Sequence, residues 1–281
     1  PIVIDLAFPT FHGQNGEDGT MQGIFEIFAI PYVGCDVVSS AITIDKVLTK
    51  LFYEKYGLPT TKFIFFDREA WENSHEAIFG NIRNNLHFPV FVKPARLGSS
   101  IGITKVESFE DLKSALEVAL HYDEKILVEE GVQNVMDVTC ALLGTTPPTP
   151  SLLQESVFHG NFFSYSDKYL KEGGVQFGKG EENIVIPARL DSETTEEIRK
   201  TAAKVFHIFG CSGIARVDFL YDKNSRMFYV NEVNTLPGTL YHHLWKKSGI
   251  ELDVLLSRLI QLAEERHAKK KNVISTFDSS V

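Results

Sequence analysis

Two short apolar segments carry polar side chains at alternate positions: residues 214–220 read IARVDFL and residues 228–234 read FYVNEVN. Both segments are rich in β-branched and aromatic residues, which indicates strands, and the polar residues between them predict a tight turn near 224–225. Because side chains alternate between the two faces of a strand, Arg216 and Asp218 share one face of the first strand. The sequence therefore predicts a hairpin with one polar face.

The second strand of this hairpin places Glu232 and Asn234 on one face, so Asp218 would lie opposite or diagonal to Glu232. Two carboxylates, an amide oxygen and an arginine would then converge. Such oxygens suit a hard cation such as Mg²⁺, whose shell can be completed by nucleotide phosphates. The alternative is that Arg216 simply neutralises the two carboxylates on a solvated face of the sheet.

A second segment, FVKPARLGSSIGITKV at 91–106, is typical of a strand, a glycine-serine turn and a second strand. Its turn offers positive charge, close backbone approach and hydroxyl donors, all suited to phosphate, from Lys93, Gly98, Ser99, Ser100 and Gly102. Because a strand follows rather than a helix, the segment is neither a P-loop nor a dinucleotide-binding turn. A purely structural hairpin is the alternative.

A third segment, HGQNGEDG at 12–19, follows an apolar run that predicts a strand at 2–8. A strand, a glycine-rich turn and a helix would bring His12 to the carboxyl end of a strand, where open α/β sheets bind ligands. A structural role for His12 is the alternative.

The periodicity of the remaining chain alternates between helical and strand patterns, which predicts a mixed α and β protein. Helices are expected at 40–56, 108–121, 193–209 and 251–267, and further strands at 90–93, 103–106, 126–130 and 138–143. The proline-rich stretch 144–150 predicts a plain connection between strands. The glycine-rich and lysine-rich stretch 164–182 predicts either a loop that closes over a site or an ordinary surface loop.

Composition excludes several classes of protein. A chain of 281 residues with 43% hydrophobic residues is long enough for about two domains with buried cores. Its formal net charge of −9 disfavours binding to nucleic acid or anionic lipid. We expect a cytoplasmic protein without membrane contact, because no apolar run approaches a membrane span and the first residues lack the pattern of a signal peptide. The three isolated cysteines predict buried, reduced thiols.

Five motifs, in this order, resemble those of the D-alanine:D-alanine ligase family of ATP-grasp enzymes, and together they cover nearly the whole chain. They are HGQNGEDG at 12–19, SAITIDK at 40–46, VKPARLGSSIG at 92–102, YSDKY at 165–169, and ARVDF at 215–219 with NEVNTLPG at 231–238. The resemblance implies a mixed α+β and α/β chain with an ATP-grasp fold, in which two α+β halves clamp ATP. It also implies three parts: the remainder of a Rossmann-like N-terminal substrate domain at 1–37, a central ATP-grasp subdomain at 38–129, and a C-terminal ATP-grasp subdomain at 130–281.

By this resemblance the protein is expected to be an ATP-dependent ligase that joins two D-alanines for peptidoglycan precursor synthesis. The carboxylate of one D-alanine would attack the γ-phosphate of ATP to give an acyl phosphate, and the amine of the second would displace phosphate. The expected cofactors are ATP and two Mg²⁺ ions, for which Mn²⁺ can substitute. The expected partners are D-alanine and a second copy of the chain in a homodimer.

The resemblance also assigns roles to individual residues. The residues expected to bind ATP are Lys46, Lys93, Gly98, Ser99, Ser100, Glu129, Glu130, Val132, Asp137 and Lys168, with the hinge 129–132 receiving adenine and Asp137 at the ribose. The expected metal ligands are Asp218, Glu232 and Asn234. The residues expected at the two D-alanines are His12 for the first, His243 for the second, Ser99 and Tyr169 to position and deprotonate the second, and Arg216 and Gly238 at the oxyanion.

Two departures from the family pattern bear on function. The family normally begins with another strand, a glycine turn and a helix that bring a glutamate to the first substrate, and no residues here correspond to them. Either the sequence is part of a longer chain or its N-terminal site is incomplete, in which case it could bind nucleotide without turnover. The second departure is TLYHH at 239–243, which replaces small residues and puts His242 and His243 near the expected carboxylate of the second substrate. D-serine or D-lactate therefore stays open as an alternative second substrate.

Overall fold

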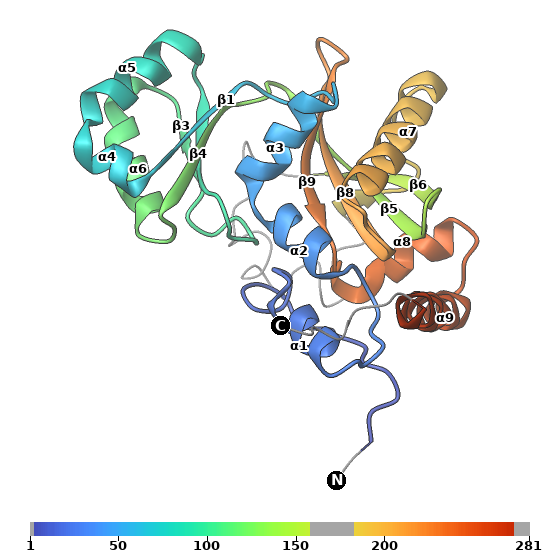
Figure 1. The fold of residues 1–281 in the computed structure, drawn as a ribbon. Helices are drawn as coiled ribbons and strands as arrows, with labels where there is room; N and C mark the ends of the chain where they lie inside the picture. Colours follow the sequence, from blue (N-terminus) through green and yellow to red (C-terminus); the bar gives the residue numbers. More distant parts are fainter. Residues whose placement is uncertain (1–2, 158–182, 273–281) are drawn as a thin grey trace, which may run out of the picture.

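The computed structural model describes residues 3–157 and 183–272, which form two antiparallel β-sheets with helices packed on them (Figure 1). The strand order is β1-β4-β2-β3 in the first sheet and β7-β6-β5-β8-β9 in the second. The predicted loop at 164–182 lies outside the described residues. Within them, no helix is long and apolar enough to cross a membrane.

The first sheet carries its helices on one face (Figure 1). Its strands are β1 Phe63–Asp67, β2 Val90–Pro94, β3 Thr104–Val106 and β4 Lys125–Glu130. Its helices are α4 Arg68–Asn73, α5 His75–Asn85 and α6 Leu112–Leu120, the last preceded by a short 3₁₀ turn at Phe109–Asp111. The predicted β2–β3 hairpin around the glycine-serine turn is present.

Among the described residues, the second sheet has five strands, and helices pack on both of its faces. Its strands are β5 Val135–Gly144, β6 Thr149–Ser156, β7 Ile184–Val185, β8 Gly213–Asp222 and β9 Phe228–Asn234. Its helices are α7 Ser192–Ile208, α8 His242–Lys247 and α9 Leu252–Lys271. The predicted elements at 138–143, 193–209, 214–220, 228–234 and 251–267 are therefore confirmed, with longer bounds for several of them.

Alternation along β8 decides which side chains enter the core. Ala215, Val217 and Phe219 point to the face covered by α7, where they are fully buried. On the opposite face, Ile214 packs against Trp245 and the helices α8 and α9 at one end of the strand. Further along, this second face carries Arg216 and Asp218 instead, so the polar cluster begins where the helical cover ends.

The predicted helix at 40–56 is wrong as a single element. It is two helices, α2 Val37–Ile44 and α3 Lys46–Lys55, separated by Asp45 in an extended conformation. The Asp45 carboxylate accepts hydrogen bonds from the backbone N–H groups of Val47 and Leu48 and thus caps α3. The apolar periodicity continues through the break, which is why periodicity alone did not reveal it.

The predicted strand at 2–8 is also wrong for its described part, residues 3–8, which makes only a single bridge between Ala7 and Tyr32. The glycine-rich loop that follows leads into α1 Thr20–Ile27, so the predicted turn and helix are confirmed. The N-terminal segment is fastened to α9 through Arg266 instead. Its guanidinium donates to the carbonyls of Tyr32 and Gly34 and to the Ser212 hydroxyl, and it lies 4.3 Å from the centre of the Tyr32 ring. All three cysteines are buried free thiols, as predicted.

Replacing Arg266 with Met is expected to lower the stability of the fold by about 2 kcal/mol, because the carbonyls of Tyr32 and Gly34 would lose their donor. In a chain of this length that corresponds to a melting temperature lower by roughly 4–8 °C in a thermal scan. The matched control is Arg258→Met on the same helix, which removes an exposed ion pair with Glu265 and should change the melting temperature little. Equal effects of the two variants would contradict the anchoring role.

Candidate active site

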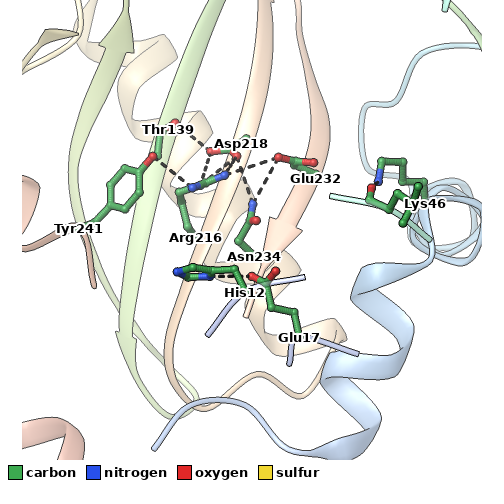
Figure 2. A network of polar contacts seen from close by, with 10 residues as sticks. His12, Glu17, Lys46, Thr139, Arg216, Asp218, Glu232, Asn234 and Tyr241 are labelled. Atoms are coloured by element: carbon green, nitrogen blue, oxygen red, sulfur yellow. Dashed lines mark hydrogen bonds and ion pairs between the residues drawn. The ribbon is translucent and has the colours of Figure 1, made fainter. Parts of the chain in front are cut away.

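The polar face of the β8–β9 hairpin brings the predicted cluster together (Figure 2). Asp218 pairs directly with Glu232 across the two strands, and Arg216 pairs with Asn234. The Arg216 Nη2 atom lies 2.5 Å from Asp218 Oδ2 and 3.5 Å from Glu232 Oε1. The side chains of Arg216 and Asp218 are 16% and 17% exposed, so this charge cluster is partly buried.

The electrostatics of the cluster follow from these contacts. Burial and the neighbouring Glu232 carboxylate raise the pKa of Asp218, and Arg216 opposes that shift. Burial disfavours the charged form of Arg216, but the attraction of Asp218 outweighs it and raises the pKa of the guanidinium. The Thr139 hydroxyl donates to Asp218 Oδ1 at 2.8 Å, and the Asn234 amide donates weakly to both carboxylates at 3.3 and 3.5 Å. The guanidinium is the charge that makes two adjacent carboxylates tolerable here.

The donor set is compatible with Mg²⁺. In the described part of the chain, no group of three or more His, Cys, Asp or Glu side chains is arranged to hold a metal. Mg²⁺, however, needs only one or two carboxylates when substrate phosphates and water complete its shell. Asp218 and Glu232 supply these, and Asn234 offers an amide oxygen after rotation of its amide group. The metal assignment of all three residues stays a prediction.

A pocket joins this cluster to the other predicted motifs. Its lining includes Glu17 from the N-terminal loop, Lys46 from α3, Gly98 from the glycine-serine turn, and Glu232 and Asn234 from β9. Segments far apart in the sequence therefore meet in one place. Figure 2 shows Lys46 on the α3 side of this place and Glu232 on the strand that faces it.

Lys46 also fixes the glycine-serine turn. Its backbone N–H donates to the Ala95 carbonyl at 2.9 Å, and its ammonium donates to the Leu97 carbonyl. In the turn itself Ser99 and Ser100 have φ values of 57° and 60°, a left-handed conformation that L side chains disfavour and that is often found at functional sites. Position 102 requires glycine, because a Cβ there would lie 2.7 Å from the Tyr122 ring.

A second charge cluster lies in the first sheet, and two of its members, Glu129 and Lys93, were predicted as ATP-binding residues. Glu129 is almost fully buried between two lysines: its carboxylate is 2.5 Å from Lys50 Nζ and is also paired with Lys93. Burial would raise the pKa of Glu129, but the two lysines outweigh it and hold the pKa well below its usual range. Lys50, which no sequence motif singled out, is fixed further by the hydroxyls of Thr60 and Thr61 at 2.9 and 2.8 Å.

This arrangement changes what the Glu129 side chain can do. Its carboxylate is engaged with Lys50 and Lys93, so it orients a predicted phosphate-binding lysine. The adenine-binding role of residues 129–132 stays a prediction. Residues 131–134 connect the end of β4 to the start of β5 and thus join the two sheets. Of the other predicted nucleotide residues, Glu130 accepts hydrogen bonds from His87, Val132 lies in this connection, and Asp137 lies on β5.

The N-terminal loop places His12 beside Glu17. The carboxylate of Glu17 lies 3.4 Å from His12 Nδ1 and accepts a hydrogen bond from the Gly13 N–H at 2.6 Å. Glu17 raises the pKa of His12, while burial and the nearby Arg216 act against that shift. Glu17 lies inside the HGQNGEDG motif, yet sequence reasoning assigned it no role.

The turn after β9 supplies the last group of side chains. Gly238 begins a 3₁₀ turn, η5 Gly238–Tyr241, and Tyr241 reaches back to Arg216. In α8, His243 lies with its Nε2 atom 2.7 Å from the Oε1 atom of the buried Gln154 on β6. His242 is exposed and contacts the Thr239 carbonyl. Lys168 and Tyr169 lie outside the described residues.

Comparisons with known proteins agree with this geometry. The family model for the C-terminus of D-ala D-ala ligase matches residues 52–261, and the model for its N-terminus matches residues 1–35. The chain belongs to the D-alanine–D-alanine ligase family. The predicted resemblance is thus confirmed, and the chain is a member of a family of carboxylate-amine ligases, which are enzymes that use ATP.

Curated relatives match over most of this chain. The D-alanine–D-alanine ligase of Acetivibrio thermocellus is 42% identical over 268 residues, which cover 94% of this chain and 69% of that protein. The D-alanine–D-alanine ligase of Thermoanaerobacter sp. (strain X514) is 44% identical over 271 residues, which cover 95% of this chain and 73% of that protein.

Solved structures confirm the ATP-grasp fold. The D-alanine-D-alanine ligase from Coxiella burnetii superposes with a TM-score of 0.80 at 30% identity, covering 95% of this chain and 70% of that one. The VanG D-Ala:D-Ser ligase from Enterococcus faecalis superposes with a TM-score of 0.81 at 38% identity, covering 93% of this chain and 74% of that one.

Replacing Glu129 with Gln is expected to destabilise the fold by about 3–5 kcal/mol at neutral pH, because Lys50 and Lys93 would lose the carboxylate that compensates their charge. Urea denaturation measures this difference. The neighbouring variant Glu130→Gln changes a more exposed carboxylate and should cost less than about 1 kcal/mol. A Glu129→Gln variant as stable as the parent would show that the cluster contributes nothing.

The same pair of proteins gives a pH test. The pKa of Glu129 is depressed in the fold, so its contribution is fully present above the unfolded value near 4.5 and is lost as pH falls towards the folded value. The stability difference between the parent and Glu129→Gln should therefore be constant from pH 7 to about 5 and shrink at lower pH. A difference that grows as the solution is acidified would reverse the assigned sign.

Proposed function

We propose that this protein is an ATP-dependent ligase that joins two D-alanines into D-alanyl-D-alanine through an acyl phosphate, for peptidoglycan precursor synthesis. The observation that supports this most is a pocket lined by Glu232 and Asn234 together with Lys46 and Gly98 of the glycine-serine turn, with Asp218 paired to Glu232 on the neighbouring strand. Carboxylates for a metal, lysines for phosphate and an arginine for a carboxyl oxygen are together the groups that activation of a carboxylic acid by ATP requires. Membership of the ligase family supports the same reaction.

Nucleotide and metal would be held by groups on both sheets. Asp218, Glu232 and Asn234 would hold two Mg²⁺ ions, for which Mn²⁺ can substitute, and these ions would neutralise charge on the transferred phosphate. Lys46 and Lys93 would bind the phosphates together with Lys168, under the turn that contains Gly98, Ser99 and Ser100. The hinge 129–132 would receive adenine, with Asp137 at the ribose.

The chain's own polar groups would then serve the two D-alanines. His12, held by Glu17, would contact the first D-alanine, whose carboxylate attacks the γ-phosphate. The amine of the second would attack the acyl carbon, and Arg216 with the backbone N–H of Gly238 would stabilise the resulting oxyanion. Ser99 and Tyr169 would position and deprotonate that amine. A homodimer in the cytoplasm belongs to the same proposal.

The second substrate depends on the surroundings of His243. This histidine contacts Gln154, a fully buried side chain that fixes the ring near the expected carboxylate of the second substrate. D-serine is a second candidate because a structural relative is named a D-Ala:D-Ser ligase. D-lactate would need the same site to accept a hydroxyl in place of the amine.

The experiment that tests this proposal measures ADP release from the purified chain with Mg²⁺ and ATP, alone and with D-alanine. Parallel reactions add D-serine or D-lactate, and mass spectrometry identifies the product. Release stimulated by D-alanine alone, with formation of the dipeptide, is expected. Nucleotide binding without stimulated release would contradict the ligase function, and a mixed product would change the second substrate.

Replacing Glu232 with Gln is expected to reduce ADP formation by at least about 100-fold, because a neutral amide replaces one of the two carboxylates of the metal site. The melting temperature should stay the same or rise, since the variant removes a negative charge that lies directly opposite the Asp218 carboxylate and repels it. Glu196→Gln on α7 is the matched control, because this exposed carboxylate pairs with Arg199 and Lys200 on the same helix and should leave turnover unchanged. Undiminished turnover in Glu232→Gln would rule out the metal assignment.

A further inference from the structure

Arg216 has two kinds of partner on opposite sides of its guanidinium (Figure 2). On one side are the carboxylates of Asp218 and Glu232. On the other is Tyr241, whose hydroxyl oxygen accepts a hydrogen bond from Arg216 Nη1 at 3.2 Å and whose ring centre lies 5.0 Å from the guanidinium carbon. The tyrosine therefore contacts the cation through both its hydroxyl and its ring.

The backbone that places Tyr241 is strained. Thr239, Leu240 and Tyr241 have φ values of 51°, 53° and 52°, so three successive residues with side chains adopt the left-handed conformation. This conformation is unfavourable for L residues and persists only where the surrounding structure enforces it. Here α8 follows at once, with Leu244 and Trp245 fully buried in the core. The strained turn thus has a structural consequence: it carries the Tyr241 ring to Arg216.

Binding of metal would weaken the contacts of Arg216 with the two carboxylates but not its contacts with Tyr241. Asp218 and Glu232 are the predicted metal ligands, and an oxygen that coordinates Mg²⁺ binds a guanidinium less strongly. Arg216 would then lose much of the attraction that positions it, just when it is needed at the oxyanion. Tyr241 has no charge to give up and is no predicted metal ligand, so its contacts with the guanidinium persist.

We propose that Tyr241 is the positioning residue for Arg216: its ring and hydroxyl keep the guanidinium in place when the carboxylates of Asp218 and Glu232 bind metal ions. This inference rests on the proposed function, because it takes from that function both the metal ligands and the role of Arg216. It adds a residue that stands where the family pattern has a small side chain, in the segment TLYHH at 239–243.

Two variants separate the contributions of the ring and the hydroxyl. Tyr241→Phe keeps the ring and removes the acceptor, so kcat for dipeptide formation should fall by about threefold. Tyr241→Leu removes both contacts and should lower kcat by at least about tenfold. In both variants the KM for ATP should stay within about twofold of the parent, because the nucleotide ligands are unchanged. Tyr56→Phe, which alters an exposed tyrosine at the end of α3, is the control.

A double-mutant cycle with Arg216→Lys distinguishes positioning from a general structural effect. If Tyr241 acts through the guanidinium, adding Tyr241→Leu to Arg216→Lys should change kcat by less than about twofold. Equal effects in the two backgrounds would overturn the proposal. So would an unchanged kcat in Tyr241→Leu.

A readout without turnover uses ¹⁵N-labelled arginine and nuclear magnetic resonance. In the metal-free protein, Arg216 Nε donates to both oxygens of Asp218 at 2.9 Å, so its N–H signal, assigned through Arg216→Lys, should be sharp in the parent and in Tyr241→Leu. On addition of Mg²⁺ and a non-hydrolysable ATP analogue, the signal should stay sharp in the parent and broaden in Tyr241→Leu. A signal that stays sharp in both, or broadens in both, overturns the proposal.

The two readouts keep this inference distinct from the proposed function. A parent protein that binds the analogue and keeps Arg216 ordered through Tyr241, but makes no dipeptide, would overturn the ligase function alone. A parent protein that binds no analogue would overturn both.

Discussion

Asp218 and Glu232 lie directly opposite each other on neighbouring strands, and two carboxylates at that spacing need a compensating positive charge. In the structure Arg216 supplies it from the same strand face, with Thr139 and Asn234 as additional donors. The apolar residues of β8 point the other way and bury themselves under α7, so the register of the hairpin fixes both the core and the cluster. The site is thus a consequence of strand alternation together with the register shift between Asp218 and Phe219, which brings Glu232 opposite Asp218.

A second buried charge balance operates in the other sheet, where Glu129 lies between Lys50 and Lys93. It holds a predicted phosphate-binding lysine on the first sheet, while the Asp218–Glu232 pair lies on the second. Residues 131–134 join the two sheets, and the pocket lined by Glu232 and Asn234 is also lined by Lys46 and Gly98. The proposed reaction would use one charge cluster from each sheet: Glu129 with its two lysines on the first, and Arg216 with Asp218 and Glu232 on the second.

The sequence predicted the parts of this arrangement that depend on local periodicity and missed those that depend on tertiary contacts. The predicted opposite or diagonal placement of Asp218 and Glu232 is confirmed, but their direct pairing also needs a register shift between Asp218 and Phe219, which the sequence did not reveal. The break at Asp45 was missed because apolar spacing continues through it, although its capping side chain was a visible signal. Lys50, Gln154 and Tyr241 acquire their roles only from residues distant in the chain, so no pattern around them reveals those roles. The family resemblance supplied the fold and the reaction, which periodicity alone did not.

The central claim is that the Asp218–Glu232–Asn234 face of the hairpin is the metal and nucleotide site. A crystal structure of the protein with Mn²⁺ and a non-hydrolysable ATP analogue tests it most directly, since the anomalous signal of Mn²⁺ locates the metal independently of the phosphates. The account predicts Mn²⁺ bound to the side-chain oxygens of these three residues, with the phosphates towards Lys46 and the glycine-serine turn. Metal and nucleotide bound elsewhere, with Arg216 still paired to both carboxylates, would contradict it.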